Sequence, residues 1–342
     1  MEKASAASEP INAFCKLILV MIIRLKKESN PSAKSMPNPP FTLFFDEIYS
    51  SGLDPSARFP VDRYAKLHDR LVEADEKRLI GWKTPRLAAK SELLLAHDED
   101  YVSRFLNLEL REDEIRRIGL RPWKDRIVER TLRLTGGALE ALERVFAGET
   151  LAGNMAGGTH HAFRAEGAGY CIFNDLAICA EKALLQPEVS RVLILDLDVH
   201  QGDGTAKIFQ DDERVYTVSL HGKNNFPFRK QISDLDLEFE NETGDAEYLN
   251  ALDKVLDKLS AEDFDLIFFQ AGVDGLASDA LGLLDLSREG LKKRNQSVFS
   301  WRKAMGAPML LFMGGGYANP IDHSVDAFCD LFLAAAEEVR SL

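Results

Sequence analysis

The sequence predicts an α/β protein, a three-layer αβα sandwich around a mainly parallel sheet. Short apolar segments with strand character alternate along the chain with longer segments whose apolar residues recur at helical spacing. This alternation is typical of βαβ units, in which helices cover both faces of a parallel sheet. Several apolar segments also end in glycines and polar side chains, where open α/β sheets build their sites. The sequence contains no internal repeat, G-x-G-x-x-G motif or phosphate-binding loop.

The first half of the chain contains one expected strand and two expected helices before the first polar strand end. Residues 41–45 have the composition of a strand, and residues 60–74 and 126–146 have helical spacing. We predict that His97, which follows an apolar run, is a structural histidine. Residues 151–158 lead into a pair of histidines, His160 and His161, that follows two glycines.

The second half alternates strands and helices regularly. Residues 234–247 contain seven acidic residues, and we expect a solvated loop there. The remaining segments are predicted from apolar runs and helical spacing. Strands are expected at residues 192–196, 215–220, 264–271 and 309–313, and helices at residues 174–185, 246–259, 287–305 and 322–340.

Length and composition limit the class of protein. The 342 residues, of which 45% are hydrophobic and 28% charged, suit a soluble protein with one large domain or two small ones. The net charge of −13 argues against direct nucleic-acid binding, which needs a basic surface. Without C-x-x-C spacing, the cysteines predict free thiols and a cytoplasmic location, with the nucleus as the alternative in a eukaryote. They are Cys15, Cys171, Cys179 and Cys329.

The first forty residues differ from the rest. Residues 14–23 are apolar but are interrupted by Lys16, and they are too short to span a bilayer, which takes ~20 apolar residues. Residues 28–40 have the proline-rich, polar composition of a flexible linker. We therefore expect residues 1–40 to be a flexible, dispensable extension and residues 41–342 to be the folded domain. A translation start at Met36 would leave that domain intact, and a weak membrane-surface helix is the alternative role for the extension.

The stretch from residue 192 to residue 204 is the most informative part of the sequence. A buried strand ends at Asp196 and is followed by Asp198 and His200. In extended backbone these three side chains, spaced by two, point the same way. Two carboxylates and an imidazole suit a divalent metal such as zinc. A strand followed by a polar turn is the alternative interpretation.

Two more polar groups follow other strands and complete a chemical pattern. Asp274, which lies beside glycines, would be the third zinc ligand next to Asp198 and His200, leaving one position open for water. Tyr317 follows three glycines and would donate a hydrogen bond to an oxyanion. The pattern predicts hydrolysis of an amide by a metal-activated water.

Two histidines and two aspartates would supply proton transfer. His160 and His161 are predicted to act as general base and acid. Asp196 and Asp203 would each orient one imidazole and raise its proton affinity. The paired histidines after glycines are uncommon in an ordinary core, which favours the chemical interpretation.

Four motifs in order are similar to those of the zinc-dependent histone deacetylase family. They are Gly-Gly-Thr-His160-His161, Asp196-Leu-Asp198-Val-His200-Gln-Gly-Asp203-Gly204, Ala-Gly-Val-Asp274 and Gly-Gly-Gly-Tyr317. The resemblance covers about residues 41–338. It implies an arginase/deacetylase fold with an eight-stranded parallel sheet, and a catalytic domain that removes acetyl or longer acyl groups from protein lysines. Arg117-Ile-Gly-Leu and residues 239–249 are most similar to class IV and related bacterial deacetylases.

The resemblance also assigns cofactors, tunnel and partner. It implies zinc on Asp198, His200 and Asp274, with Fe²⁺ as the alternative metal, and an acyl-lysine protein or peptide as substrate, without stable membrane insertion. It implies a structural potassium ion held by oxygens of Asp196, Asp198, His200, Ser219 and Leu220. It places Gly169, Tyr170, Phe226 and Leu281 along the acyl-lysine tunnel, with Tyr170 where class I members have phenylalanine.

Three alternatives remain. An acetylpolyamine amidohydrolase would have an acid where this chain has Leu281, although the acidic residues 234–247 would be a substitute. An arginase-like ureohydrolase has D-x-H-x-D, whereas Asp203 stands one position further from His200 here, which favours a single metal. A catalytically inactive acyl-lysine reader is disfavoured because every predicted ligand, acid and base is present.

Overall fold

The structure, a computed structural model, describes residues 41–340 and contains one sheet of eight strands. All neighbouring strands pair in parallel, in the order β2-β1-β3-β8-β7-β4-β5-β6. The strands are β1 (Phe41–Phe44), β2 (Ile80–Lys83), β3 (Leu151–Asn154), β4 (Val192–Asp196), β5 (Val215–Gly222), β6 (Leu235–Phe239), β7 (Leu266–Gln270) and β8 (Met309–Phe312). This arrangement confirms the predicted α/β fold and the eight-stranded parallel sheet.

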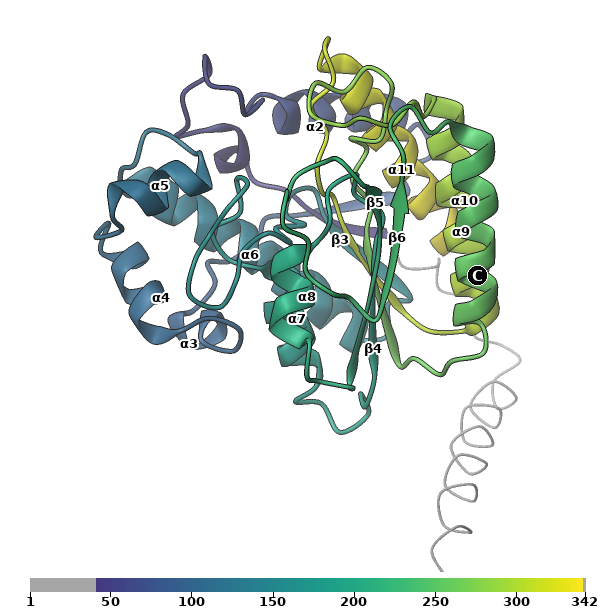
Figure 1. The fold of residues 1–342 in the computed structure, drawn as a ribbon, viewed down its shortest axis with the longest axis horizontal. Helices are drawn as coiled ribbons and strands as arrows, with labels where there is room; N and C mark the ends of the chain where they lie inside the picture. The colour runs from purple at the N-terminus through teal and green to yellow at the C-terminus, as the bar shows by residue number, and fades with distance from the viewer. Residues whose placement is uncertain (1–40, 341–342) are drawn as a thin grey trace, which may run out of the picture. The chain divides into compact units, whose positions relative to one another are not determined.

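Helices cover both faces of the sheet. In Figure 1, α9, α10 and α11 lie on one side of the strands, and α6, α7 and α8 lie on the other. Helix α2 packs against α11, and α3 packs against α7. The helices are α2 (Arg63–Ala74), α3 (Lys90–Leu93), α4 (Glu99–Leu106), α5 (Glu112–Ile118), α6 (Asp125–Phe146), α7 (Asp175–Ala183), α8 (Asp203–Phe209), α9 (Asp245–Leu259), α10 (Arg288–Met305) and α11 (Asp322–Arg340), with a 3₁₀ turn, η1 (Glu47–Ser50).

The central strands are buried on both faces, which explains their continuous apolar sequences. Every residue of β4, β7 and β8 is buried. The predicted strands and long helices are found with ends that differ by at most three residues. The short elements β2, η1, α3, α4, α5 and α8 were not predicted, because four to eight residues give too little periodicity to identify them.

The predicted acidic loop at residues 234–247 is wrong over Leu235–Phe239. These residues form the edge strand β6, which pairs with β5. Asp236 and Glu238 are exposed, whereas Leu235 and Leu237 between them are half-buried. Acids at every second position therefore mark the solvent side of an edge strand, where charge also discourages pairing with another chain.

The sheet topology brings the polar segments together. Strands β3, β8, β7 and β4 are consecutive neighbours, and because they are parallel their carboxyl ends lie along one edge. The loops that follow them contain His160, Tyr317, Asp274 and Asp198, respectively. Segments separated by more than 150 residues in the sequence thus meet at one place, as the strand-end argument predicts.

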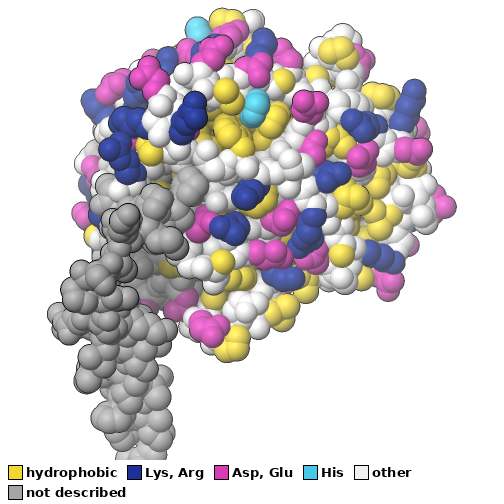
Figure 2. Space-filling model, turned by 180° about the vertical axis from the view of Figure 1, so that it is seen from behind, with side chains coloured by type: hydrophobic (Ala, Val, Ile, Leu, Met, Phe, Trp, Pro, Cys, Tyr) yellow, Lys and Arg dark blue, Asp and Glu magenta, His cyan; other side chains and the backbone are white. Residues whose placement is uncertain are grey.

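Two sequence-based expectations concern membrane insertion and the thiols. No described helix is long and apolar enough to cross a membrane. Cys171, Cys179 and Cys329, the cysteines within residues 41–340, are buried and free, as predicted. Acidic and basic side chains are interspersed over the face shown in Figure 2, which has no broad area of one charge. The extension predicted for residues 1–40 lies outside the described residues.

We predict that deleting residues 1–35 leaves folding and activity unchanged, because every site residue predicted from the sequence lies between residues 160 and 317. The expected kcat is within about twofold of the full chain, which is ~0.4 kcal/mol of barrier. Thermal unfolding and kcat measured on both chains provide the check. A shortened protein that is insoluble, or that loses most of its kcat, would contradict the prediction.

Candidate active site

Asp198, His200 and Asp274 converge at the carboxyl ends of β4 and β7. One potential ligand atom from each residue lies within 4.8 Å of the others, and all three side chains are buried. His200 Nδ1 lies 3.0 Å from both Asp198 Oδ1 and Asp274 Oδ2. Two carboxylate oxygens and an imidazole nitrogen around one point form a donor set that suits zinc.

Backbone amides fix the two carboxylates. Asp198 Oδ2 accepts a hydrogen bond of 2.7 Å from the Gly315 amide, and Asp274 Oδ1 accepts one of 2.9 Å from the Val199 amide. A side chain at position 315 would collide with Asp274 Oδ2, so this position requires glycine. The glycines after β8 therefore allow the backbone to approach the carboxylates closely.

The charges at this point fit a bound cation. Burial and the nearby Asp198 carboxylate raise the pKa of Asp274 to about 7. Burial lowers the pKa of His200, but its hydrogen bonds to Asp198 and Asp274 outweigh that effect and raise it to about 10. These shifts show that the two carboxylates favour a positive charge between them, which a divalent metal would supply on binding.

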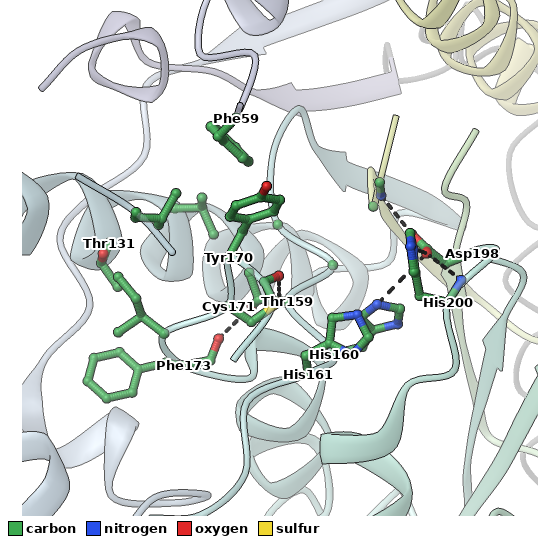
Figure 3. A pocket seen from close by; sticks show the side chains of 18 of the residues that line it. Phe59, Thr131, Thr159, His160, His161, Tyr170, Cys171, Phe173, Asp198 and His200 are labelled. Atoms are coloured by element: carbon green, nitrogen blue, oxygen red, sulfur yellow. Dashed lines mark hydrogen bonds and ion pairs between the residues drawn. The ribbon is translucent and has the colours of Figure 1, made fainter. Parts of the chain in front are cut away.

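His160 and His161 lie side by side and face Asp198 and His200 (Figure 3). Their ring centroids are 4.1 Å apart. His160 Nδ1 lies 2.6 Å from Asp196 Oδ2, and His161 Nδ1 lies 2.6 Å from Asp203 Oδ1, with all four side chains buried. Each aspartate therefore holds the Nδ1 side of one imidazole, which directs Nε2 toward the rest of the site.

The two histidines differ in proton affinity, which the sequence does not distinguish. For His160, burial opposes protonation, but the Asp196 and Asp198 carboxylates outweigh it and raise the pKa to about 9. For His161, burial and the neighbouring His160 outweigh Asp203 and lower the pKa to about 4. Asp203 raises the pKa of His161, as expected, but burial and His160 have the larger effect.

Tyr317 lies beside the three metal-ligand candidates. Its ring centroid is 6.5 Å from that of His200. Its backbone amide donates a hydrogen bond of 2.7 Å to Asp279 Oδ2, which fixes the loop after β8. Burial raises the pKa of the Tyr317 hydroxyl well above 10, so the hydroxyl keeps its proton and can donate a hydrogen bond.

The four predicted tunnel residues line one pocket together with His161, His200 and Tyr317. This pocket encloses about 510 Å³. The ring of Phe226 packs edge-on against His161 at 4.8 Å, and a Cβ at Gly169 would lie 2.7 Å from His161 Cδ2. Leu281 is held in place because its amide donates to Asp279 Oδ1 at 2.8 Å. The pocket is lined by Arg58, Arg117, Ile118, Gly119, His161, Gly169, Tyr170, His200, Asn224, Asn225, Phe226, Phe228, Ala280, Leu281, Leu283 and Tyr317.

A second, smaller cavity of about 50 Å³ lies on the inner side of the same residues. It is lined by His160, His161, Asp198, His200 and Tyr317 and continues past Phe59 and Tyr170 toward α6 (Figure 3). Its wall also contains two arginines with only 3% of their surface exposed, Arg63 and Arg130.

Two buried charged residues, Asp175 and Arg294, and the half-buried Asp279 support the site and were not predicted. Asp175, the first residue of α7, accepts hydrogen bonds from the Gly158 and Thr159 amides at 3.0 and 2.8 Å, which shapes the loop before the histidines. Arg294 of α10 donates to the carbonyls of Leu197, Ala271 and Gly272. Asp279 fixes both Tyr317 and Leu281. Charged residues such as these are normally exposed, so the sequence contains no signal for these roles.

Two other predictions have different outcomes. His97 is buried and accepts a hydrogen bond of 2.9 Å from the Asn174 amide, which confirms a structural role. Ser219 pairs with Asp196 across β5 and β4, and its hydroxyl lies 2.9 Å from His221 Nδ1. The potassium site on Asp196, Asp198, His200, Ser219 and Leu220 stays a prediction.

Comparisons with known proteins agree with this geometry. The family model described as "Histone deacetylase domain" matches residues 57–331. An uncharacterised protein from a Picosynechococcus strain is 42% identical over 282 residues, which are 82% of this chain and 93% of that protein. "Histone deacetylase 2" of Arabidopsis thaliana is 30% identical over 290 residues, covering 79% of this chain and 74% of that protein. The crystal structure of the HDA15 HD domain matches 87% of this chain and 89% of that one with a TM-score of 0.74 at 22% identity, which supports the fold.

The matched family model and relatives, together with the parallel sheet, define a member of the arginase/deacetylase superfamily. Within that superfamily, the matched domain and the relatives are those of deacetylase hydrolases. The chain belongs to the histone deacetylase family. Its similarity to the class IV branch stays a prediction.

Proposed function

We propose that this protein is a zinc-dependent hydrolase that removes acetyl groups from lysine side chains of proteins or peptides. The observation that supports the proposal most strongly is the buried Asp198–His200–Asp274 group at the inner end of the pocket lined by Tyr170 and Leu281. A pocket that ends at such a group suits a long side chain whose amide lies at its tip. The three free, buried cysteines support a reducing compartment such as the cytoplasm.

In this proposal Asp198, His200 and Asp274 hold the metal. Zinc bound there would activate a water molecule and polarise the acyl carbonyl; Fe²⁺ is the alternative metal. A potassium ion near Ser219 would have a structural role. The donor geometry supports this assignment, because His200 Nδ1 lies within 3.0 Å of an oxygen from each carboxylate.

The chain's other residues would move the protons and stabilise charge. His160 and His161 lie beside the ligand group, so one imidazole would accept a proton from water while the other gives a proton to the departing lysine amine. Asp196 and Asp203 orient these rings through Nδ1. Tyr317 would donate a hydrogen bond from its hydroxyl to the oxyanion that forms from the acyl carbonyl.

The second candidate, an acetylpolyamine amidohydrolase, has less support at the pocket mouth. A polyamine is cationic and needs a carboxylate there, but among the described residues that line the pocket near Leu281 there is no Asp or Glu. The acidic residues 234–247 do not line it either. Asp234 and Asp236 instead accept hydrogen bonds from Thr217 and Gln201.

The proposed function is tested by comparing two substrates on one zinc-loaded preparation. We expect acetate release from an acetyl-lysine peptide and kcat/KM at least tenfold lower for acetylspermidine, a ~1.4 kcal/mol difference. Faster hydrolysis of acetylspermidine would favour the polyamine alternative. Hydrolysis of neither substrate by a zinc-loaded, folded protein would contradict the proposed function.

The inner cavity predicts a preference for short acyl groups. A volume of about 50 Å³ holds only a few water-sized groups, which matches an acetyl group but not a long chain. Forcing extra methylenes into a packed site typically costs ~1–3 kcal/mol, so kcat/KM should fall at least about fivefold from acetyl to octanoyl-lysine. Initial rates on peptides that differ only in acyl length provide the measurement. Equal or faster removal of octanoyl would show that the cavity opens.

A further inference from the structure

The mouth of the substrate pocket is positively charged although the whole chain has a net charge of −13. Two arginines, Arg58 and Arg117, line the pocket, and among its described lining residues there is no carboxylate. Asn224 is exposed and also lines the pocket, whereas Asn225 is buried and donates to the Leu281 carbonyl. The charged side chains at the mouth would therefore attract an anion and repel a cation.

Of the two arginines, Arg58 has the charge that is available to a ligand. Arg117 forms an ion pair with Glu166, which offsets its charge. Arg58 is exposed and forms no ion pair with any residue between 41 and 340. The Arg58 charge acts on the pocket wall, because it lowers the pKa of Tyr170, which burial raises. Arg58 thus lies at the rim of the site with its guanidinium donors unused by a carboxylate.

The neighbouring loop, residues 223–232, is also basic. Residues 223–232 contain three basic residues and no acid. Two of the three charges are engaged, since Lys223 pairs with Glu240 and Lys230 donates to the backbone carbonyls of Asn225 and Pro227. Arg229 stays exposed at the tip beside Phe228, whose side chain is 87% exposed. The loop therefore adds a cation and an apolar surface next to the mouth.

We propose that the mouth selects acyl-lysine substrates with a carboxylate beside the acylated lysine, and that Arg58 binds this carboxylate. The inference rests on the proposed function and names a substrate class for the same site. The carboxylate has two possible sources: an acidic residue flanking the acylated lysine in a peptide, or the α-carboxylate of acyl-lysine itself. In both cases it stays outside the passage while the acyl group reaches Asp198 and His200.

The chemistry of the pair favours arginine for this task. A guanidinium offers paired donors that match both oxygens of a carboxylate. Because Arg58 is exposed, solvent weakens the interaction, and the expected preference is on the order of three- to fivefold in kcat/KM. Salt should reduce it further, because the Debye length falls to ~3 Å at 1 M ionic strength.

The test uses acetyl-lysine peptides that differ only in whether Glu, Gln or Lys flanks the acetylated lysine. We expect kcat/KM to fall in the order Glu, Gln, Lys for the zinc-loaded full chain, and the Glu-to-Gln ratio to approach one in 1 M salt. A second arm compares Nε-acetyl-lysine with its α-amide, which tests the α-carboxylate as the source. A preference in either arm identifies that source.

Variants assign the preference to a residue. R58Q should bring the ratio close to one, R58K should retain part of it, and R58E should reverse it in favour of the Lys peptide. R214Q is the matched control, because Arg214 is an exposed arginine that precedes β5, at the opposite edge of the sheet from the site. It removes an arginine that pairs with Asp212 away from the pocket, and it should keep the wild-type ratio.

The outcomes separate this inference from the proposed function. Equal rates for the Glu and Gln peptides, together with equal rates for acetyl-lysine and its amide, would overturn the inference while hydrolysis itself stands. A preference that R58Q leaves unchanged would overturn the assignment to Arg58. Hydrolysis of none of the substrates would contradict the proposed function, and the inference with it.

Discussion

Replacing Tyr317 by phenylalanine is expected to lower kcat by ~10²–10³, the typical effect of losing one oxyanion donor. Tyr317→Phe keeps the ring, which packs against the Arg63 guanidinium at 5.3 Å and the Tyr170 ring at 5.8 Å. It also keeps the backbone hydrogen bond to Asp279. Since the hydroxyl is not a metal-ligand candidate, zinc content and folding should stay close to those of the wild type.

Zinc stoichiometry and kcat measured on the same preparation decide the role of this hydroxyl. Tyr216→Phe is the control, because Tyr216 lies on β5 and packs against Phe264 outside the site. Its kcat should be that of the wild type. If Tyr317→Phe has full zinc and a kcat within about threefold of wild type, a difference of only ~0.65 kcal/mol, Tyr317 is not the oxyanion donor.

Replacing Asp274 by alanine is expected to abolish both zinc binding and hydrolysis. Loss of a partner that merely orients a metal ligand typically costs ~10–100-fold in metal affinity, so loss of a ligand should cost more. The variant also removes the acceptor of the Val199 amide, and an unpaired buried donor costs about 1–3 kcal/mol of stability. A loss of activity could then reflect unfolding instead of lost metal.

Asp274→Asn separates these effects, because the amide oxygen still accepts from Val199 while the carboxylate charge is gone. We expect this variant to be more stable than Asp274→Ala and still to bind zinc much more weakly than the wild type. Zinc content after dialysis, together with thermal unfolding of both variants, provides the measurement. Stoichiometric, tightly bound zinc with near-normal turnover in Asp274→Ala would refute the ligand assignment.

The strands, and the polar residues that follow them, could be predicted from the sequence. A buried parallel strand has a continuous apolar sequence, so β4 and β7 could be located to within two residues. Because all carboxyl ends lie along one edge, the polar residues after those strands had to meet. The sequence therefore predicts that Asp198, His200 and Asp274 lie close together. In the structure, one potential ligand atom from each of them lies within 4.8 Å of the others.

The remainder depends on packing between segments that are distant in sequence. Asp175 and Arg294 are charged helix residues, and only tertiary contacts show that they are buried against the site loops. The opposite pKa shifts of His160 and His161 arise from their mutual contact and from unequal exposure to carboxylates. Arg58 could not be recognised either, because its neighbours at the mouth are more than 50 residues away in the chain.

The central claim, metal-dependent hydrolysis of acetyl-lysine, is tested most directly by removing and restoring the metal. Acetate release from an acetyl-lysine peptide is measured on one preparation as purified, after chelation and dialysis, and after addition of one equivalent of zinc. We predict that chelation removes nearly all activity and that one equivalent of zinc restores it while the fold persists throughout. Undiminished acetate release from the folded, metal-free protein would contradict the claim.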